Sequence, residues 1–290
     1  MIRLPIAKTP KVYVGGAFIR SESGRVQPLH DARGGFVAHI PQCTRKDVRN
    51  AVEAAAKAGP AWAQRTPYNR GQILYRLAEM LESRATEMAQ AMAIDGTSSV
   101  RAAQREVAAT CDRLVYFAGW ADKFGQVLGN TNPVATPHFN FTVCEPMGII
   151  GVLAGDDAPL LGIVSQLVAI IVSGNTVVAL AAERHPYPAV LLGEILAVSD
   201  VPPGVVNLLT GRRHELVPTF ATHAHLRGID AVITSADERK QLGLGAAESV
   251  KRMRYREAKA LDWANAAEHE HVYAIRDFVE FKTTWHPIGA

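Results

Sequence analysis

The stretch from Gly148 to Gly211, GIIGVLAGDDAPLLGIVSQLVAIIVSGNTVVALAAERHPYPAVLLGEILAVSDVPPGVVNLLTG, alternates short apolar runs with longer helical patterns. Alternation of this kind is typical of a parallel sheet that is wrapped by helices through right-handed crossovers. We therefore expect a parallel α/β part over residues 147–255, with helices on both faces. The strands that the pattern predicts are Ile149–Leu153, Thr176–Leu180, Val205–Leu209 and, further on, Ala231–Ile233, with one of the helices at Ala189–Val198.

Residues 1–125 carry the apolar spacing of long amphipathic helices. A hairpin is expected first, over Val12–Arg20, because the alternating residues meet a Gly-Gly turn. Thr44, with Asp47 three residues later, predicts the N-cap of the first helix. The helices expected in this part run from Thr44 to near Gly59-Pro60, over Arg70–Ala93 and over Arg101–Phe124.

One uncharged stretch, Pro159–Ala182, is long enough to cross a bilayer. Ser165 and Gln166 interrupt it, and Ser173-Gly174-Asn175 is a helix-stop signal. We therefore expect a buried helix followed by a strand, and no membrane association.

The composition excludes several classes of protein. Hydrophobic residues make up 48% and charged residues 20% of the 290, which is typical of a globular chain and not of a disordered or collagen-like one. Lys+Arg 31 minus Asp+Glu 28 gives +3, so charge gives no reason to expect nucleic acid as a partner. The three cysteines lack CxxC spacing, which argues against a disulfide framework and a zinc site. With no apolar leader at the N-terminus, a cytoplasmic location is expected.

The residue pattern changes after Gly125, from helical spacing to prolines and alternating apolar residues. Three prolines, at 133, 137 and 146, surround the alternating run Phe139–Val143. Because proline cannot donate to a central ladder, this pattern predicts an extended arm with an edge strand over residues 126–146.

Five motifs stand in order along the chain: Phe117–Lys123 (FAGWADK), Glu145–Val152 (EPMGIIGV), Gly174–Val178 (GNTVV), Pro202–Asn207 (PPGVVN) with Thr210-Gly211, and Glu280–Trp285 (EFKTTW). Each motif is weak alone, whereas five in this order are specific, and together they resemble the aldehyde dehydrogenase superfamily. The first is similar to the segment that closes the family's N-terminal helices, the next three to the first three strands of its cofactor domain, and the last to its C-terminal arm strand.

The resemblance implies N-terminal helices, a Rossmann-like sheet that binds NAD(P), an extended β arm for oligomerisation, and a separate catalytic domain with a cysteine nucleophile. Here the chain passes from Lys251-Arg252 to the arm-like Ala274–Trp285 in a short span. We expect the catalytic domain to be missing, as in the defective second domain of two-domain aldehyde dehydrogenases. The parts expected are residues 1–125 (N-terminal helices), 126–146 (arm), 147–255 (Rossmann-like part) and 256–290 (linker and C-terminal arm strand).

Departures from the family pattern fall on the residues that do chemistry. The asparagine that donates to the oxyanion aligns with Asp157, whose carboxylate would repel that oxyanion. The cofactor-contacting lysine aligns with Leu180, and the Glu-Leu-Gly-Gly-Lys segment with Arg256–Ala260, which has no Gly-Gly and no clear general base. We therefore expect no catalytic residue in this chain.

The cofactor site is expected to be degraded in a similar way. Glu183 is retained to accept from a ribose hydroxyl, whereas Lys240 stands where the family has the glycine of a helix N-terminus. A pyrophosphate needs close approach to bare backbone N–H groups there, which a side chain obstructs. NAD(P) remains a candidate cofactor, and no metal is expected. The candidate cofactor-binding residues are Glu183, Thr234, Ser235 and Gly211.

Three further features admit a chemical interpretation. The pairs His223-Ala224-His225 and His269-Glu270-His271 are better explained as solvated loop histidines than as metal ligands. The basic run Lys251–Lys259 could bind phosphates, although a solvated face or a contact with an acidic partner is favoured. Among Cys43, Cys111 and Cys144, Cys43 is the least implausible nucleophile, and packing is the preferred role of all three.

These observations predict an aldehyde dehydrogenase family protein that is a non-catalytic subunit. The arm would join it to a full-length NAD(P)-dependent aldehyde dehydrogenase or to a second copy of itself, because exposed strands are stabilised by adding to another sheet. Two alternatives stay open. One is an active NAD(P)-dependent oxidoreductase that acts on the aldehyde or oxo group of donors, with Asp157 or Glu183 in a new role. The other is a free-standing nucleotide-binding regulator.

Overall fold

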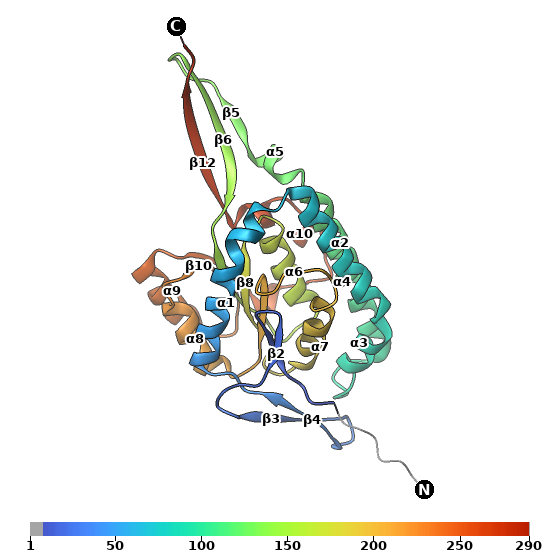
Figure 1. The fold of residues 1–290 in the computed structure, drawn as a ribbon. Helices are drawn as coiled ribbons and strands as arrows, with labels where there is room; N and C mark the ends of the chain where they lie inside the picture. Colours follow the sequence, from blue (N-terminus) through green and yellow to red (C-terminus); the bar gives the residue numbers. More distant parts are fainter. Residues whose placement is uncertain (1–7, 290) are drawn as a thin grey trace.

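A seven-stranded sheet lies at the centre of the structure, a computed structural model that describes residues 8–289 (Figure 1). Its strands follow the order β11-β10-β7-β8-β9-β1-β2, in which β7 to β11 are parallel and the β1–β2 hairpin is antiparallel. The strand order reverses between β7 and β10, which makes this the topological switch point of the sheet. The strands are β1 (Val12–Val14), β2 (Ala17–Ile19), β7 (Ile149–Leu153), β8 (Thr176–Leu180), β9 (Val206–Leu209), β10 (Leu226–Ile233) and β11 (Arg252–Glu257).

The predicted α/β architecture is confirmed. Strands β7 and β8 have the bounds expected from the sequence, and every residue in them is buried because helices cover both faces. The predicted hairpin also forms, and it extends the sheet through the pairing of Tyr13 with Leu208. Strand β11 was not expected, since its sequence, RMRYRE, reads as a basic surface run.

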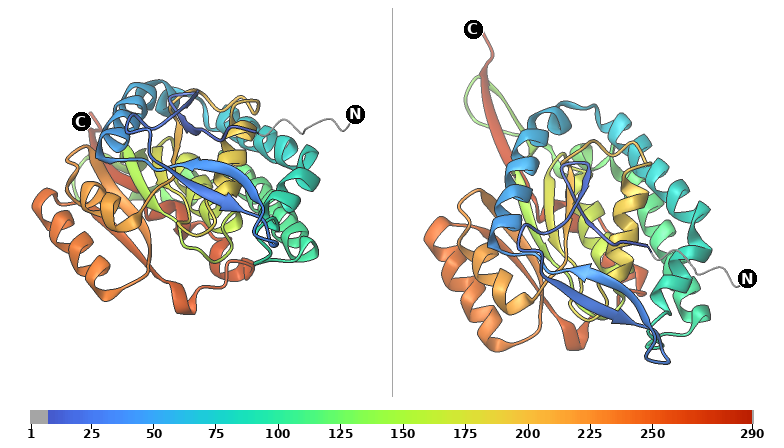
Figure 2. Two further views of the ribbon diagram at one scale, coloured as in Figure 1. Left: turned by 90° about the horizontal axis from the view of Figure 1, so that it is seen from below. Right: turned by 60° about the horizontal axis from the view of Figure 1, so that its bottom comes forward.

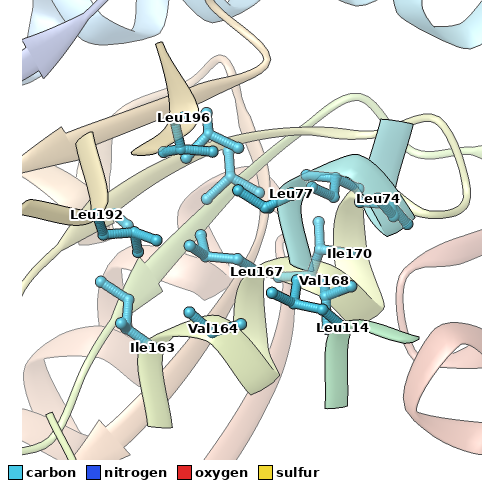
Figure 3. Packing of buried hydrophobic residues seen from close by; sticks show 14 of the residues in the cluster. Leu74, Leu77, Leu114, Ile163, Val164, Leu167, Val168, Ile170, Leu192 and Leu196 are labelled. Atoms are coloured by element: carbon cyan, nitrogen blue, oxygen red, sulfur yellow. The ribbon is translucent and has the colours of Figure 1, made fainter. Parts of the chain in front are cut away.

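On one face of the sheet, the buried helix α6 (Leu161–Ile171) lies between the strands and an outer layer of helices. All of its residues are buried, which confirms that the uncharged stretch is an interior helix followed by β8. Figure 3 shows its Leu167 and Val168 among Leu77 and Leu114 of the outer helices. Within residues 8–289, no helix is both long and apolar enough to span a membrane. The outer helices are α2 (Pro67–Ser83), α3 (Ala85–Met92) and α4 (Val100–Trp120), whereas α7 (Tyr187–Leu196) packs directly on β9 and β1 on the same face as α6.

Helices α1 (Arg45–Gln64), α8 (Arg213–Thr222) and α9 (Ala236–Ser249) cover the opposite face (Figure 2). Helix α1 continues through Pro60, so its expected end near Gly59-Pro60 is wrong. Its last turn is held because the Trp62 indole is buried and donates to the Ile171 carbonyl at 3.0 Å. The helix expected over Arg70–Ala93 is also interrupted, at Arg84, where the guanidinium turns to Glu87 and Glu194.

A β arm projects from the body at the top of Figure 1. It consists of β5 (Asn130–Asn132), β6 (His138–Pro146) and β12 (Val279–Pro287), in the order β12-β6-β5. Both predicted arm strands therefore form, and they pair with each other along nine residues of antiparallel register. The structure also contains an unexpected hairpin, β3 (Val26–His30) and β4 (Phe36–Pro41), and the short helix α5 (Phe124–Leu128).

The segment between β11 and β12 folds back on the body. Its Trp263 is buried against Leu161 and Val232, and the buried Arg113 of α4 donates to the Trp263 carbonyl at 3.1 Å and to Glu270 at 3.0 Å. The segment is therefore an ordered cover of the sheet. Its helical turns are η1 (Ala258–Ala260), α10 (Ala266–His269) and α11 (Tyr273–Arg276). The four-part division of the chain stays a prediction.

Candidate functional site

A cavity of ≈ 540 Å³ opens at the carboxyl ends of β7, β8, β9 and β10. Open α/β sheets bind their ligands at this edge, beside the switch point. Glu183, Thr234 and Ser235, three of the four residues predicted to contact a cofactor, come together here. The lining residues are Asp156, Glu183, Arg184, Arg213, His214, Val217, Thr234, Ser235, Asp237, Glu238 and Gln241.

Glu183 follows β8 and caps the N-terminus of α8. Its Oε2 accepts from the backbone N–H of Arg213 at 2.8 Å, and its Oε1 lies 3.4 Å from the guanidinium of Arg212. A carboxylate is stabilised at this position because the free N–H groups and the helix dipole are both positive there. The candidate ribose acceptor thus already has partners within the chain.

The side chain of Arg213 lies across the switch point. Its Nη1 donates to the carbonyl of Ala154 at the end of β7 (2.6 Å), and its Nη2 donates to the carbonyl of Val232 in β10 (2.8 Å). The same guanidinium pairs with Glu238, at 2.5 Å from Nη2 to Oε1 and 3.2 Å from Nε to Oε2. Both side chains of this ion pair are more than nine-tenths buried.

Thr234 and Ser235 also make their hydrogen bonds inside the chain. The Thr234 hydroxyl donates to Glu238 Oε2 at 2.7 Å, and the Ser235 hydroxyl accepts from the Glu238 N–H at 3.1 Å as the N-cap of α9. The first turn of α9 carries Asp237 and Glu238. Two carboxylates therefore stand at the positive end of this helix.

Gly211 is not among the residues that line the cavity. A Cβ at this position would lie 3.2 Å from both the backbone nitrogen and the carbonyl oxygen of Cys43. The absence of a side chain allows the loop after β9 to pack against the chain at Cys43, whose N–H donates to Thr210. The structure thus gives Gly211 a packing role.

Asp157 is exposed on the loop after β7. Within residues 8–289 its carboxylate makes no hydrogen bond, whereas the neighbouring Asp156 accepts from the Arg184 N–H at 2.9 Å. Asp157 does not line the cavity.

Arg256 stands in the segment where the family resemblance puts the general base. Its guanidinium pairs with Asp230, which is 1% exposed, and Gln166 donates to the same carboxylate at 3.0 Å. Burial alone would raise the pKa of Asp230, but the charge and hydrogen bonds of Arg256 hold it below the ordinary value. A guanidinium has no lone pair to accept a proton, so Arg256 cannot act as a general base.

The three cysteines lack the environment of a nucleophile. Burial, with the nearby Asp47 carboxylate, raises the pKa of Cys43 to about 12, and burial raises that of Cys111 to about 11. The pKa of Cys144 is raised as well, again by burial. A reactive thiol has the opposite shift, produced by a cation or a helix N-terminus.

The histidine pairs and the basic run are also placed by the structure. His269 is buried against Trp263, so the expectation of a solvated loop histidine is wrong for this residue. In the basic run, Arg252 pairs with Glu280 and Arg256 with Asp230, so a wholly solvated face is wrong too. Among residues 8–289, no group of three or more His, Cys, Asp or Glu side chains could hold a metal ion.

Sequence reasoning missed Arg213, Glu238 and Asp230. The pairs that they form join segments that lie 25 and 26 residues apart in the chain. A signal was nevertheless present, because two arginines directly follow the glycine at 211 and two acids open the helix after Ser235.

Comparison with known proteins places the chain in a family. The model of the aldehyde dehydrogenase family matches residues 18–255. A putative aldehyde dehydrogenase, DhaS, of Bacillus subtilis (strain 168) is 30% identical over 249 residues, and retinal dehydrogenase 2 of Mus musculus is 33% identical over 230 residues. They align with 84% and 78% of this chain, but with only 50% and 43% of their own lengths.

Solved structures agree with this assignment. The NAD⁺ complex of an aldehyde dehydrogenase from Bacillus cereus is 25% identical and superimposes with a TM-score of 0.80, covering 86% of this chain and 50% of that one. The HpcC structure from Thermus thermophilus has 27% identity and the same TM-score, and it covers 86% of this chain and 48% of that one. This chain therefore spans about half the length of the relatives that it matches, and it belongs to the aldehyde dehydrogenase family.

Proposed function

We propose that this chain is a non-catalytic aldehyde dehydrogenase family subunit that assembles, through its β arm, with a full-length NAD(P)-dependent aldehyde dehydrogenase. The observation that carries the proposal is the outer edge of β12. Within residues 8–289, β12 pairs only with β6, so its other edge is open along the strand. An open edge of this length presents backbone N–H and C=O groups that another strand can pair with.

The side chains of the arm support an interface on both of its faces. Residues opposite each other in an antiparallel pair share a face, so Phe281 and Trp285 lie on one face and Phe139 and Val143 on the other. These four side chains are between 39% and 57% exposed. Large apolar side chains on both faces of a projecting ribbon favour an arm that is enclosed by a partner.

The chemistry of the chain supports a role without catalysis. Asp157 replaces an oxyanion donor with a carboxylate, and Arg256 is committed to an ion pair with Asp230. The pKa of every thiol is raised, so thiolate is scarce at neutral pH. Leu180 and Lys240, at the family's lysine and glycine positions, would weaken NAD(P) binding by this chain. The proposal places the protein in the cytoplasm, where its three free cysteines would stay reduced.

The test is whether a partner co-purifies with this chain. The tagged chain is isolated from its own host, the mass of the intact complex is measured, and NAD-dependent aldehyde oxidation is assayed on the same fraction. We expect a stoichiometric complex with an aldehyde dehydrogenase, which carries the activity. The double variant Phe281→Ser/Trp285→Ser should lose the complex, because it removes the apolar anchors from one face of the arm.

The matched control is Phe36→Ser, on β4, which removes an aromatic side chain of similar exposure (56%) far from the arm. It should leave assembly unchanged. A chain that stays monomeric would overturn the proposal, and a homo-oligomer would support the arm but contradict the dehydrogenase partner. Aldehyde oxidation by the isolated chain would establish the oxidoreductase alternative. Tight NAD(P)H binding by a monomer without turnover would establish the regulator.

A further inference from the structure

A dinucleotide at the carboxyl edge of this sheet would need bare N–H groups at a helix N-terminus for its pyrophosphate. At α9 that end carries Asp237 and Glu238, and the Ser235 hydroxyl already caps the helix through the Glu238 N–H. The cavity is lined by four acids and two arginines. Because the acids outnumber the arginines, the lining opposes a doubly charged diphosphate. The residues present do not fit the cofactor's phosphates.

The crevice at the switch point is occupied by Arg213. Its guanidinium is within hydrogen-bond distance of three groups, the carbonyl at the end of β7, the carbonyl of Val232 in β10 and the carboxylate of Glu238. On the other side of the same β10 residue, the Val232 side chain packs with Trp263. The carboxyl end of β10 is therefore covered from both directions by this chain's own side chains.

We infer that the Arg213–Glu238 ion pair blocks phosphate binding in this cavity from within, with the Glu238 carboxylate in the place of a ligand phosphate. A carboxylate and a phosphate bind a guanidinium in the same two-pronged geometry, so one can substitute for the other. Glu238 also accepts a hydrogen bond from the hydroxyl of Thr234, another of the residues predicted to bind the cofactor. A dinucleotide phosphate could reach Arg213 only by displacing Glu238, whose buried carboxylate would then lose the guanidinium. This inference is independent of the arm and of any partner.

The experiment is equilibrium dialysis of the full chain with NAD⁺, NADP⁺ and ADP-ribose, together with thermal unfolding in the presence of each. The wild-type chain should show no saturable binding below about 1 mM and no ligand-dependent shift in Tm. The variant Glu238→Gln keeps the shape of the side chain but leaves Arg213 without a counter-charge. It should bind ADP-ribose saturably at about 0.1 mM or below, at least tenfold under the limit set for the wild type, and ADP-ribose should raise its Tm.

The control is Glu257→Gln, which frees the exposed Arg239 from its own carboxylate partner in the neighbouring strand. It should not gain affinity. Saturable wild-type binding of NAD⁺ at micromolar concentration would overturn the inference. The inference would also be overturned if the wild type does not bind and Glu238→Gln has no higher affinity, since the ion pair would then not be what blocks phosphate binding. If Glu238→Gln is too unstable to isolate, Glu238→Asp, which keeps the charge but draws the carboxylate back from Arg213, replaces it and should show the same gain in affinity. None of these outcomes bears on assembly through the arm, so the two proposals can fail separately.

Discussion

The guanidinium of Arg256 forms a two-pronged ion pair with Asp230, with Nε 2.7 Å from Oδ1 and Nη2 2.8 Å from Oδ2. The side chains are 8% and 1% exposed. The family resemblance puts the general base in this segment, where Arg256 is a buried cation and the carboxylate of Glu257 is exposed and paired with Arg239. The Arg256–Asp230 pair joins the edge strand β11 to β10 and is part of the structural core.

Asp230→Asn should destabilise the fold strongly, because it leaves Arg256 buried without a counter-charge. We expect a loss of about 3–5 kcal/mol in the free energy of unfolding, measured by urea denaturation at pH 7. The double variant Asp230→Leu/Arg256→Met should recover part of the loss, since it removes both charges. The control Glu79→Gln, which breaks the exposed pair with Arg76, should change stability by less than about 1 kcal/mol. Equal effects at the two sites would contradict the burial argument.

Two glycines in helices should respond in opposite directions to the same substitution. Gly162 in α6 faces Trp263, and a Cβ there would lie 2.9 Å from the indole nitrogen, whereas Gly119 in α4 has nothing within 4 Å. Gly162→Ala should cost about 1–3 kcal/mol through overpacking. Gly119→Ala should stabilise by about 0.5–1 kcal/mol, because alanine loses less backbone entropy in a helix. Thermal unfolding of the two variants tests this, and a neutral Gly162→Ala would show that Trp263 does not press on α6.

How much of this fold is predictable depends on where the partners of each residue lie. The uninterrupted apolar runs of β7 and β8 are enough to predict these two strands from the sequence, because a strand that is buried on both faces is apolar along its whole length. Strand β11 was missed for the opposite reason. Its alternating arginines read as a surface, and the acids that neutralise them, Asp230 and Glu280, lie elsewhere in the chain.

The candidate site shows the same limit. The turn after β10 and the acid after β8 could be located from the family motifs, and the structure brings Glu183, Thr234 and Ser235 to one cavity. The motifs could not show that these three side chains already make hydrogen bonds within the chain. That result follows from the path of one long side chain, Arg213, across the switch point, and no local pattern encodes it.

The thiols give a direct chemical test of the absence of a nucleophile. With a pKa of about 12, the Cys43 thiol is thiolate in only about one molecule in 10⁵ at pH 7. Iodoacetamide labelling of the native chain, followed by mass spectrometry, should leave Cys43 unmodified until the protein is unfolded in urea. Cys144, which is less buried, should react first among the three. Rapid labelling of native Cys43 at neutral pH would contradict a buried thiol of raised pKa, and Cys43 would again be a candidate nucleophile.

His269 should make the stability of the protein depend on pH between about 6.5 and 4. Its ring stacks on Trp263 with centroids 4.6 Å apart, and its Nε2 donates to the Asp262 carbonyl at 2.9 Å. Burial, with the charges of Arg256, Arg113 and Arg254, lowers its pKa to about 4. The unfolded chain has the ordinary histidine pKa, about 6.5, so it binds a proton in this range while the folded chain does not. Stability is therefore complete above pH 6.5 and falls as the pH is lowered toward 4.

The size of this effect can be isolated with a variant that does not titrate. We expect the wild type to lose on the order of 2 kcal/mol of unfolding free energy between pH 7 and pH 4.5 beyond the loss seen in His269→Gln. The exposed His39 supplies the control, because His39→Gln should keep the wild-type pH dependence. The NMR shift of the His269 ring proton should stay constant down to about pH 5. If it titrates instead near pH 6.5, the ring is solvated, and the segment between β11 and β12 does not cover the sheet as a packed element.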